Sequence, residues 1–320
     1  MTAAENVFGR VLSQRARRPL LVDVGSADGA PPVWRTIAPW CCYLAFDADP
    51  RASGDRRAQF QESVVSTHAV VADLAAGDIV LYLTEAAQCS STLRPDPASL
   101  AEYFFSPLFE VKAEKHVPAT TLDDELARRA WPCIDWLKID SQGTDLRIFQ
   151  SLRDDVRDRV LALDLEPGLI DAYEGEDLFV DSHRTVVRQG FWLSNVRIGQ
   201  AVRMRRSTLR AIEPRHADVT PVTIETGVRG TPAWVEARYL RTIEWVVARS
   251  GPHDLPLLWV FAVLDGQIGF ALDVAVAYRE HAGPGAMADL LENEAVRILR
   301  QPARDRAFKR AARRLRAAWR

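Results

Sequence analysis

A lysine and an aspartate stand two positions apart in the segment IDWLKIDSQGTDLRIFQSL, which runs from Ile134 to Leu152. Side chains alternate along a strand, so Lys138 and Asp140 would share one face at the end of a buried apolar run. Burying such charges is costly unless they pair with each other or bind a ligand. The two residues therefore either close a strand end as an ion pair or let Asp140 handle a proton or a cation at a reacting group.

A second pair of acidic residues follows in LALDLEP, where Asp164 and Glu166 alternate in the same way. In the usual order of a parallel sheet, this strand is the neighbour of the strand that carries Lys138. The sequence thus predicts several carboxylates around one lysine. Glu166 could assist Asp140 in moving a proton, and Asp164 or Glu166 could help to hold Mg²⁺.

A glycine-containing turn follows the first apolar run, in the segment LLVDVGSADG. A strand that ends in such a turn brings backbone N–H groups to a ligand. The dinucleotide fingerprint G-x-G-x-x-G needs a second glycine where this chain has Ala27, whereas S-adenosylmethionine carries no phosphate and tolerates a side chain there. The turn therefore favours the methyl donor. The residues expected at the cofactor are Asp23, Gly25, Ser26, Ala27 and Gly29.

Acidic residues also end the next two predicted strands. Asp47 follows Asp23 by 24 positions, where a carboxylate can accept hydrogen bonds from both hydroxyls of a ribose. Capping of its own loop is the alternative role for Asp47. Asp73 ends the third predicted strand, SVVSTHAVVAD, and completes the expected cofactor site.

These residues require a sheet that brings several strand ends to one edge. Strand-like and helix-like segments alternate up to about Thr242, which predicts a mostly parallel sheet with crossover helices. A helix should begin after Thr120 or Thr121, because acidic residues fill the turn that follows. The predicted strands cover residues 19–25, 41–47, 63–73, 133–140 and 159–167, with a hairpin partner of the third over 78–84 and an antiparallel pair over 191–199 and 234–243.

The last quarter of the chain is helical in pattern and carries no recognisable chemistry. We therefore expect one domain over 1–242 and a helical segment over 243–320. The segment ends in a basic amphipathic stretch over 303–320, which either packs on its own domain or contacts a membrane surface as a peripheral helix.

Composition narrows the class of protein. The chain has 320 residues, of which 48% are hydrophobic and 26% charged, as in a globular protein, and a net charge of −2 gives no general attraction to nucleic acid. Its four cysteines lack metal-site spacing, and the N-terminus lacks the apolar core of a signal peptide. We expect a cytoplasmic protein, with a second location at the inner membrane face if the basic stretch binds lipid.

The order of these segments resembles the FkbM family of S-adenosylmethionine-dependent methyltransferases. The resemblance covers roughly residues 15–242 and rests on LVDVGSADG, LAFDADP, TTLDDEL, IDWLKIDSQGTDLRIFQSL, LALDLEP, YEGEDLF and VRQGFWLS. It implies a Rossmann-like class I methyltransferase fold, in which helices flank a mostly parallel seven-stranded sheet and a helical segment follows.

The resemblance also implies roles for individual residues. Asp47 stands at the ribose position, where the family usually has glutamate, and Asp145 replaces a frequent glutamate without an assigned role. The remaining matches are Asp23, Gly25 and Gly29 around the methionine part of the cofactor, Asp73 near the adenine, and Lys138, Asp140 and Gly143 in the K-I-D-x-x-G element.

Members of this family usually methylate hydroxyl groups, often on sugars of glycans or glycolipids. We therefore expect an O-methyltransferase that uses S-adenosylmethionine on a sugar hydroxyl of a glycan, glycolipid or glycosylated metabolite. The catalytic candidates are Asp140, Lys138 and Glu166, and a role for Mg²⁺ is left open. Two alternatives are a non-catalytic module that keeps the fold and an NAD(P)-dependent oxidoreductase, against which Ala27 counts.

Overall fold

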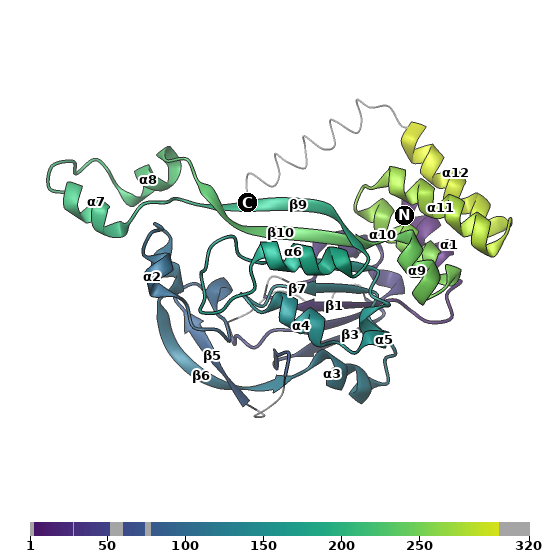
Figure 1. The fold of residues 1–320 in the computed structure, drawn as a ribbon, viewed down its shortest axis with the longest axis horizontal. Helices are drawn as coiled ribbons and strands as arrows, with labels where there is room; N and C mark the ends of the chain where they lie inside the picture. The colour runs from purple at the N-terminus through teal and green to yellow at the C-terminus, as the bar shows by residue number, and fades with distance from the viewer. Residues whose placement is uncertain (1–2, 28, 52–59, 74–77, 301–320) are drawn as a thin grey trace.

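A seven-stranded sheet forms the centre of the protein (Figure 1). The structure is a computed structural model and describes residues 3–27, 29–51, 60–73 and 78–300, so the basic stretch over 303–320 lies outside it. The strands have the order β3-β2-β1-β7-β8-β10-β9, and β10 alone runs antiparallel to its two neighbours. Their bounds are β1 Leu20–Val24, β2 Cys42–Phe46, β3 Glu62–Ser66, β7 Trp136–Ile139, β8 Ala162–Leu165, β9 Phe191–Ala201 and β10 Thr231–Arg241.

The predicted third strand is wrong in its second half. It was expected to continue to Asp73, but β3 ends at Ser66, where the Ser66 hydroxyl accepts a hydrogen bond from the backbone N–H of His68 at 3.3 Å. The chain then enters a second, three-stranded sheet of order β4-β6-β5. The predicted strand over 78–84 pairs with β6 in this sheet and not with the third strand. The bounds are β4 Ala69–Val70, β5 Asp78–Thr84 and β6 Val111–Thr120.

One face of the large sheet is covered by short helices from the middle of the chain. The first of them, α3, begins at the predicted N-cap, because the Thr121 hydroxyl accepts a hydrogen bond from the Asp124 backbone N–H at 3.1 Å. Apolar side chains of this face, such as Val22, Leu137 and Phe149, form one buried cluster. The helices are α3 Leu122–Arg129, α4 Asp145–Ser151, α5 Asp154–Arg157 and α6 Phe179–Arg188.

The opposite face is covered by helices from the two ends of the chain. Between β1 and β2 the chain makes only two short 3-10 turns, at Pro32–Thr36 and Ala38–Trp40, in place of a long crossover helix. Helices from beyond residue 242 cover this face instead and share one core with Leu21 and Trp136 of the sheet. They are α9 Ile243–Arg249, α10 Leu255–Leu264, α11 Ile268–Ala282 and α12 Ala286–Arg300, joined by α1 Ala3–Leu12.

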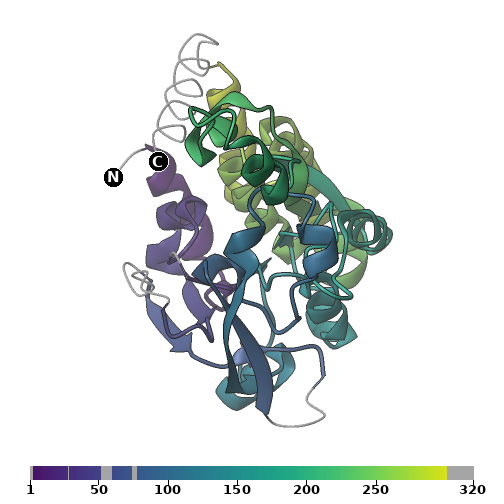
Figure 2. The same ribbon diagram turned by 90° about the vertical axis from the view of Figure 1, so that its left-hand side faces the viewer.

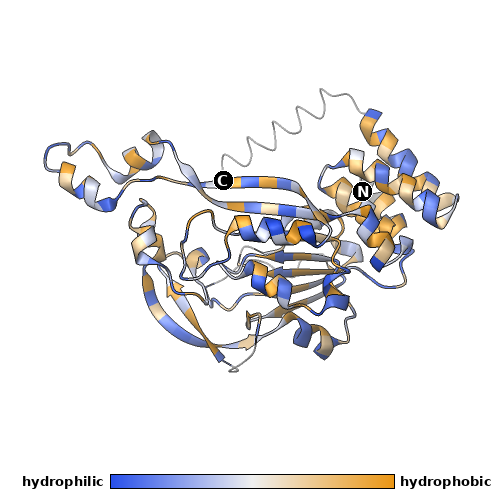
Figure 3. Cartoon of the chain, viewed as in Figure 1, coloured by the Kyte–Doolittle hydropathy of each residue, from blue (hydrophilic) through white to orange (hydrophobic). Residues whose placement is uncertain are grey.

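Helix α10 is apolar on all sides because it is buried on all sides. Eight of its ten residues are buried, and Figure 3 shows hydrophobic residues concentrated where helices meet the sheet. The helical pattern that the sequence predicts for this part of the chain is confirmed. Among the described helices, none is long and apolar enough to cross a membrane.

Strands β9 and β10 continue beyond the sheet into an arm that carries two further helices, α7 Arg206–Ile212 and α8 Pro221–Gly227 (Figure 1). Helix α2, Pro97–Leu100, belongs to a long connection between β5 and β6 that packs against this arm through Phe104. Figure 2 shows β5 and β6 at the end of the molecule opposite the C-terminal helices. The strand ends of the large sheet therefore lie between the small sheet and the arm.

Candidate functional site

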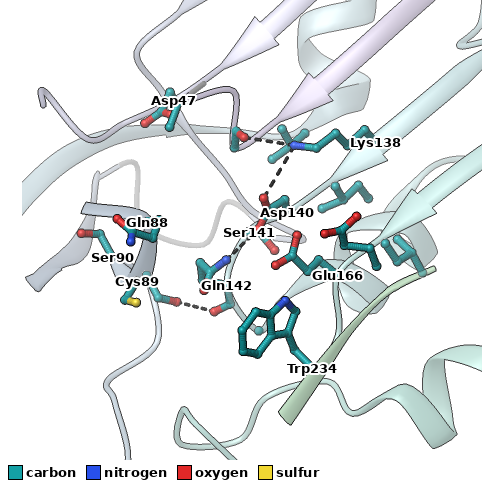
Figure 4. A pocket seen from close by; sticks show the side chains of 18 of the residues that line it. Asp47, Gln88, Cys89, Ser90, Lys138, Asp140, Ser141, Gln142, Glu166 and Trp234 are labelled. Atoms are coloured by element: carbon teal, nitrogen blue, oxygen red, sulfur yellow. Dashed lines mark hydrogen bonds and ion pairs between the residues drawn. The ribbon is translucent and has the colours of Figure 1, made fainter. Parts of the chain in front are cut away.

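A cavity of about 780 Å³ lies at the carboxyl ends of β1, β2, β7 and β8 (Figure 4). The glycine turn after β1 and the end of β2 form one wall, and residues 87–92 form another. Strands β9 and β10 border the other end of the cavity, three strands away from β1 in the sheet. This volume is in the usual range for ligand sites, and the crevice at the strand ends is where open α/β sheets bind ligands.

The glycine turn is held tightly against the neighbouring strands. The backbone N–H groups of Gly25 and Ser26 both donate to the Phe46 carbonyl at 3.0 Å. Gly25 has φ +77°, and a Cβ atom there would lie 2.0 Å from the Asp140 carbonyl oxygen. Only glycine fits this position. Gly25, Ala27 and Gly29 line the cavity, as the sequence predicts, whereas Ser26 is buried behind the turn.

Asp23 supports the turn from below. It is fully buried, and its carboxylate accepts hydrogen bonds from Lys138 Nζ at 3.0 Å and from the Tyr43 hydroxyl at 2.9 Å. Burial raises the pKa of Asp23, and the Lys138 ammonium opposes that change. Lys138 also donates to the Gly25 carbonyl at 3.2 Å. Asp23 itself does not line the cavity and acts on it only through Lys138, which is a lining residue.

Lys138 stays positively charged although it is largely buried. Burial by itself lowers the pKa of Lys138, but the charges of Asp23 and Asp140 raise it by more, so that the net change is upward. Its Nζ lies 3.7 Å from Asp140 Oδ2, an ion pair drawn in Figure 4. The ion pair expected from the sequence is therefore present, and both residues also line the cavity.

Opposite charges continue across the sheet in one row. Lys138 is in register with Asp23 on one side and with Asp164 on the other, and Asp164 is in register with Arg238 of β10. Arg238 binds both carboxylate oxygens of Asp164, at 2.7 and 2.8 Å, and reaches Asp265 at 3.1 Å. Asp164 lines the cavity, but its charge is fully paired.

Asp140 is oriented by the loop that follows β7. The side-chain amide of Gln142 donates to Asp140 Oδ1 at 2.7 Å (Figure 4). Gln142 has φ +58°, which is unusual for a residue with a side chain, and such strain often marks a functional site. The Tyr173 hydroxyl, 3.0 Å from Gln142 Oε1, and the Ser91 hydroxyl, which donates to the Gln142 carbonyl at 2.6 Å, fix this loop.

Asp145 forms hydrogen bonds to the chain at the ends of both β7 and β8, but its side chain does not face a reacting group. One of its oxygens accepts hydrogen bonds from the Ser141 backbone and hydroxyl at 2.9 and 2.6 Å, and the other accepts from the Glu166 backbone at 2.7 Å. Burial raises the pKa of Asp145 to about 6. We regard Asp145 as a positioning residue.

Glu166 lines the cavity beside Asp140, and its surroundings favour the protonated carboxyl. Burial, followed by the charges of Asp140, Asp145 and Glu236, raises its pKa to about 9. A protonated carboxyl can donate one hydrogen bond and accept others. Lys138, Asp140 and Glu166, the three catalytic candidates, thus lie in one cavity with different charges.

The two remaining cofactor candidates have different positions. Asp47 lines the cavity at the end of β2 and accepts a hydrogen bond from the Asp49 backbone at 2.9 Å, so it both caps its loop and faces the site. Asp73 is exposed and lies beyond β4, outside the cavity wall. The structure does not bring Asp73 to the site because the chain leaves the large sheet after Ser66. His68, Ala69 and Val70 line the cavity instead.

A site for Mg²⁺ lacks the necessary ligands. Within the described ranges, no three histidine, cysteine, aspartate or glutamate side chains converge as a metal would require. Asp164, one of the two Mg²⁺ ligands that the sequence suggested, has both carboxylate oxygens bound by Arg238. The residues present do not fit a divalent cation, and no chemical step is assigned to one.

Several residues of the site do not stand out in the sequence. Gln142 lies inside the recognised motif but has no charge to draw attention to it. Tyr173, Trp234 and Arg238 come from loops and strands far from that motif. The two-residue alternation of β10 was the only available indication for Trp234 and Arg238, since it places both on one face with Glu236.

A sequence model described as the methyltransferase FkbM domain matches residues 23–191, more than half of the chain. The match begins at Asp23 of β1 and ends at the first residue of β9, so it includes the glycine turn and the strand ends that carry Asp140 and Glu166. No curated protein shows a significant match to the chain. The position of the family match over these strand ends shows that the chain belongs to the FkbM methyltransferase family.

Proposed function

We propose that the protein is an S-adenosylmethionine-dependent O-methyltransferase with a Rossmann-like class I fold. The observation that carries this proposal is the Gly25 turn, which is packed against the Asp140 carbonyl and opens into a cavity that also holds the Asp140 carboxylate. The sheet order with β10 as its one antiparallel member supports the fold assignment. Ala27 in the turn supports a methyl donor over a dinucleotide.

The cavity fits S-adenosylmethionine on chemical grounds. Gly25 has no Cβ atom, and a Cβ atom at this position would fill the turn. The backbone of the turn can therefore lie close to the methionine part of the cofactor. Asp47 would accept hydrogen bonds from the ribose hydroxyls, and Ala69 and Val70 offer an apolar surface beside it. When bound, the cofactor supplies an electrophilic methyl group.

The residues of this chain then have to orient an acceptor hydroxyl and remove its proton. Asp140 accepts that proton on its carboxylate, which Gln142 holds in place at 2.7 Å. Lys138 Nζ lies 3.7 Å from the same carboxylate and places a positive charge beside it. A positioned base of this kind contributes about 10²- to 10⁴-fold in rate. Glu166, whose raised pKa favours the protonated carboxyl, can donate a hydrogen bond to the acceptor.

We propose a sugar hydroxyl of a glycan, glycolipid or glycosylated metabolite as the acceptor, in accordance with the family. A cytoplasmic location and peripheral membrane contact through residues 303–320 belong to the same proposal. Neither is needed for the chemistry at the strand ends.

The test is thermal unfolding of the full chain with S-adenosylmethionine, S-adenosylhomocysteine, NAD⁺ or NADP⁺ in excess. A ligand at a hundred times its Kd adds about 2.7 kcal/mol, which raises the unfolding temperature by several degrees. We expect a shift with the two adenosyl ligands alone. Asp140→Asn should keep this shift and lose methyl transfer to glycoside acceptors. A shift with NAD⁺ alone would instead support an oxidoreductase, and no shift at all would support a non-catalytic module.

A further inference from the structure

Trp234 borders the cavity at the end farthest from the proposed cofactor turn. It belongs to β10, which is separated from β1 by β7 and β8 in the sheet. Figure 4 shows its indole ring beside Glu166, across the cavity from Asp47. Trp234 lies outside the matched family domain, so neither the family match nor the motif around Asp140 assigns it a role.

The chain is built to hold this ring in one place. Trp234 pairs with Gly199 of β9, and a Cβ atom at Gly199 would lie 2.0 Å from Cε2 of the indole. A side chain at position 199 would therefore displace the ring. Tyr103, Phe105 and Ile170 belong to the apolar cluster against which Trp234 packs. The rest of the half-buried ring borders the cavity.

Two polar groups at this end of the cavity have hydrogen-bonding capacity to spare. Among the described residues, neither the Trp234 indole N–H nor the Glu166 carboxyl makes a hydrogen bond to another residue, and both residues line the cavity. Donors and acceptors that face a ligand site without partners are best satisfied by a ligand with several hydroxyl groups.

We infer that Trp234 is the platform on which the sugar ring of the acceptor lies, with a hydroxyl directed to Glu166. This inference rests on the proposed function and adds a specific binding subsite to it. The apolar C–H face of a pyranose covers an indole ring well, and its hydroxyls lie at the ring edge, where the polar groups are. A planar phenolic acceptor would also stack, but it would leave those polar groups unpaired, which costs binding free energy.

The experiment uses the full chain with ¹⁵N-labelled tryptophan indoles, saturated with S-adenosylhomocysteine. Methyl pyranosides of glucose, mannose, galactose and rhamnose are titrated in turn, with phenol as the planar comparison. Trp234→Phe identifies the Trp234 resonance among the nine tryptophans. We expect at least one pyranoside to move this resonance, and Trp131, which lies outside the cavity, to stay unchanged.

Two substitutions test the platform itself. Trp234→Ala should raise the Kd of the responding pyranoside roughly tenfold through loss of ring contact. Gly199→Ala should do the same by displacing the indole, while Trp131→Ala should have no effect. Binding of S-adenosylhomocysteine should be unchanged in all three, which shows that they fold.

The outcomes separate the two proposals. If wild type does not bind S-adenosylhomocysteine, the proposed function fails, and the platform fails with it. If it binds but no pyranoside moves the Trp234 resonance, or phenol alone does, only the platform is overturned. Unchanged pyranoside affinity in Trp234→Ala would also overturn it.

Discussion

Glu166 differs from the carboxylates around it because it keeps its proton at neutral pH. Its pKa of about 9 in the folded protein compares with about 4.3 in an unfolded chain. Between these values the native state binds one more proton than the unfolded state, so the stability that this proton provides is lost as pH rises toward 9. A glutamine at position 166 carries no charge at any pH.

We therefore predict that Glu166→Gln gains stability over wild type as pH rises. The gain should be small at pH 5 and roughly 1–3 kcal/mol at pH 8. Urea unfolding at several pH values measures it. Glu225→Gln, exposed on α8 and outside the cavity, is the matched control and should change stability little. Parallel stability curves for Glu166→Gln and wild type would show that Glu166 is ionised in the folded protein.

The sequence indicated the charged residues of the site and the pair of Lys138 with Asp140, but not the partners that come from distant strands. Lys138, Asp140 and Glu166 were predictable because strand alternation places charges at the ends of apolar runs. The pairing of Asp164 with Arg238 was not, because 74 residues separate them and only the sheet brings them together. The Trp234 platform depends on a glycine of another strand in the same way.

At the scale of elements, the turn after β1 depends on a close contact as well as on a positive φ. Gly175 provides a matched comparison, since it has φ +71° but no atom within 4 Å of where its Cβ would be. We predict that Gly175→Ala costs about 1 kcal/mol from the backbone conformation alone. Gly25→Ala should cost about 2–5 kcal/mol, because the Asp140 backbone must also move.

Urea unfolding and calorimetric binding of S-adenosylhomocysteine test this comparison. Gly25→Ala should abolish binding and Gly175→Ala should preserve it. Equal losses of stability in the two variants would mean that the contact with Asp140 does not determine the turn.

The Tyr173 hydroxyl links the site to the segment of the chain between β5 and β6. Tyr173 lies 2.9 Å from the Cys89 carbonyl and 3.0 Å from Gln142 Oε1. We predict that Tyr173→Phe costs about 1 kcal/mol and speeds amide hydrogen exchange at residues 89–91. Tyr103→Phe, which loses only a 3.3 Å hydrogen bond from Arg203, should leave that exchange unchanged. If both variants exchange alike, the Tyr173 hydroxyl does not anchor this segment.

Most elements of the large sheet follow from apolar runs and turn residues, and the predicted pairings of β7 with β8 and of β9 with β10 are confirmed. The small sheet could not be predicted from the sequence, for a physical reason. Most residues of β6 are exposed, and four of the six residues in the segment VKAEKH are charged or polar, so the segment has no strong apolar face to indicate a strand. The break after Ser66 is equally hidden, because the apolar run simply resumes at Ala69 in another sheet.

For the whole molecule, the helices beyond Thr242 complete the core of the sheet. Trp259 and Phe261 of α10 are fully buried, and the Phe261 ring lies 4.8 Å from that of Trp136 in β7. Asp265, at the end of α10, also binds Arg238 in the charged row. The domain over 1–242 that we expected from the sequence thus has one face formed by later residues.

We predict that a chain ending at Thr242 does not fold. Its circular dichroism and urea unfolding should lack a cooperative transition, whereas the full chain shows one. In the full chain, Trp259→Ala should cost about 3–5 kcal/mol, and Val276→Ala, nearly half exposed on α11, less than about 0.5 kcal/mol. Cooperative unfolding of the shorter chain would show that the sheet does not need α10.

The late position of α10 in the chain has a consequence for protein synthesis. The strands that carry Leu21 and Trp136 leave the ribosome long before residues 255–262 exist to cover them. During that interval an entire apolar sheet face is open to water and to other nascent chains, a state in which chains aggregate and chaperones bind. The first and last described helices, α1 and α12, meet only after residues 286–300 have been synthesised. The strands that form the candidate site therefore emerge well before the helices that cover the opposite face of their sheet.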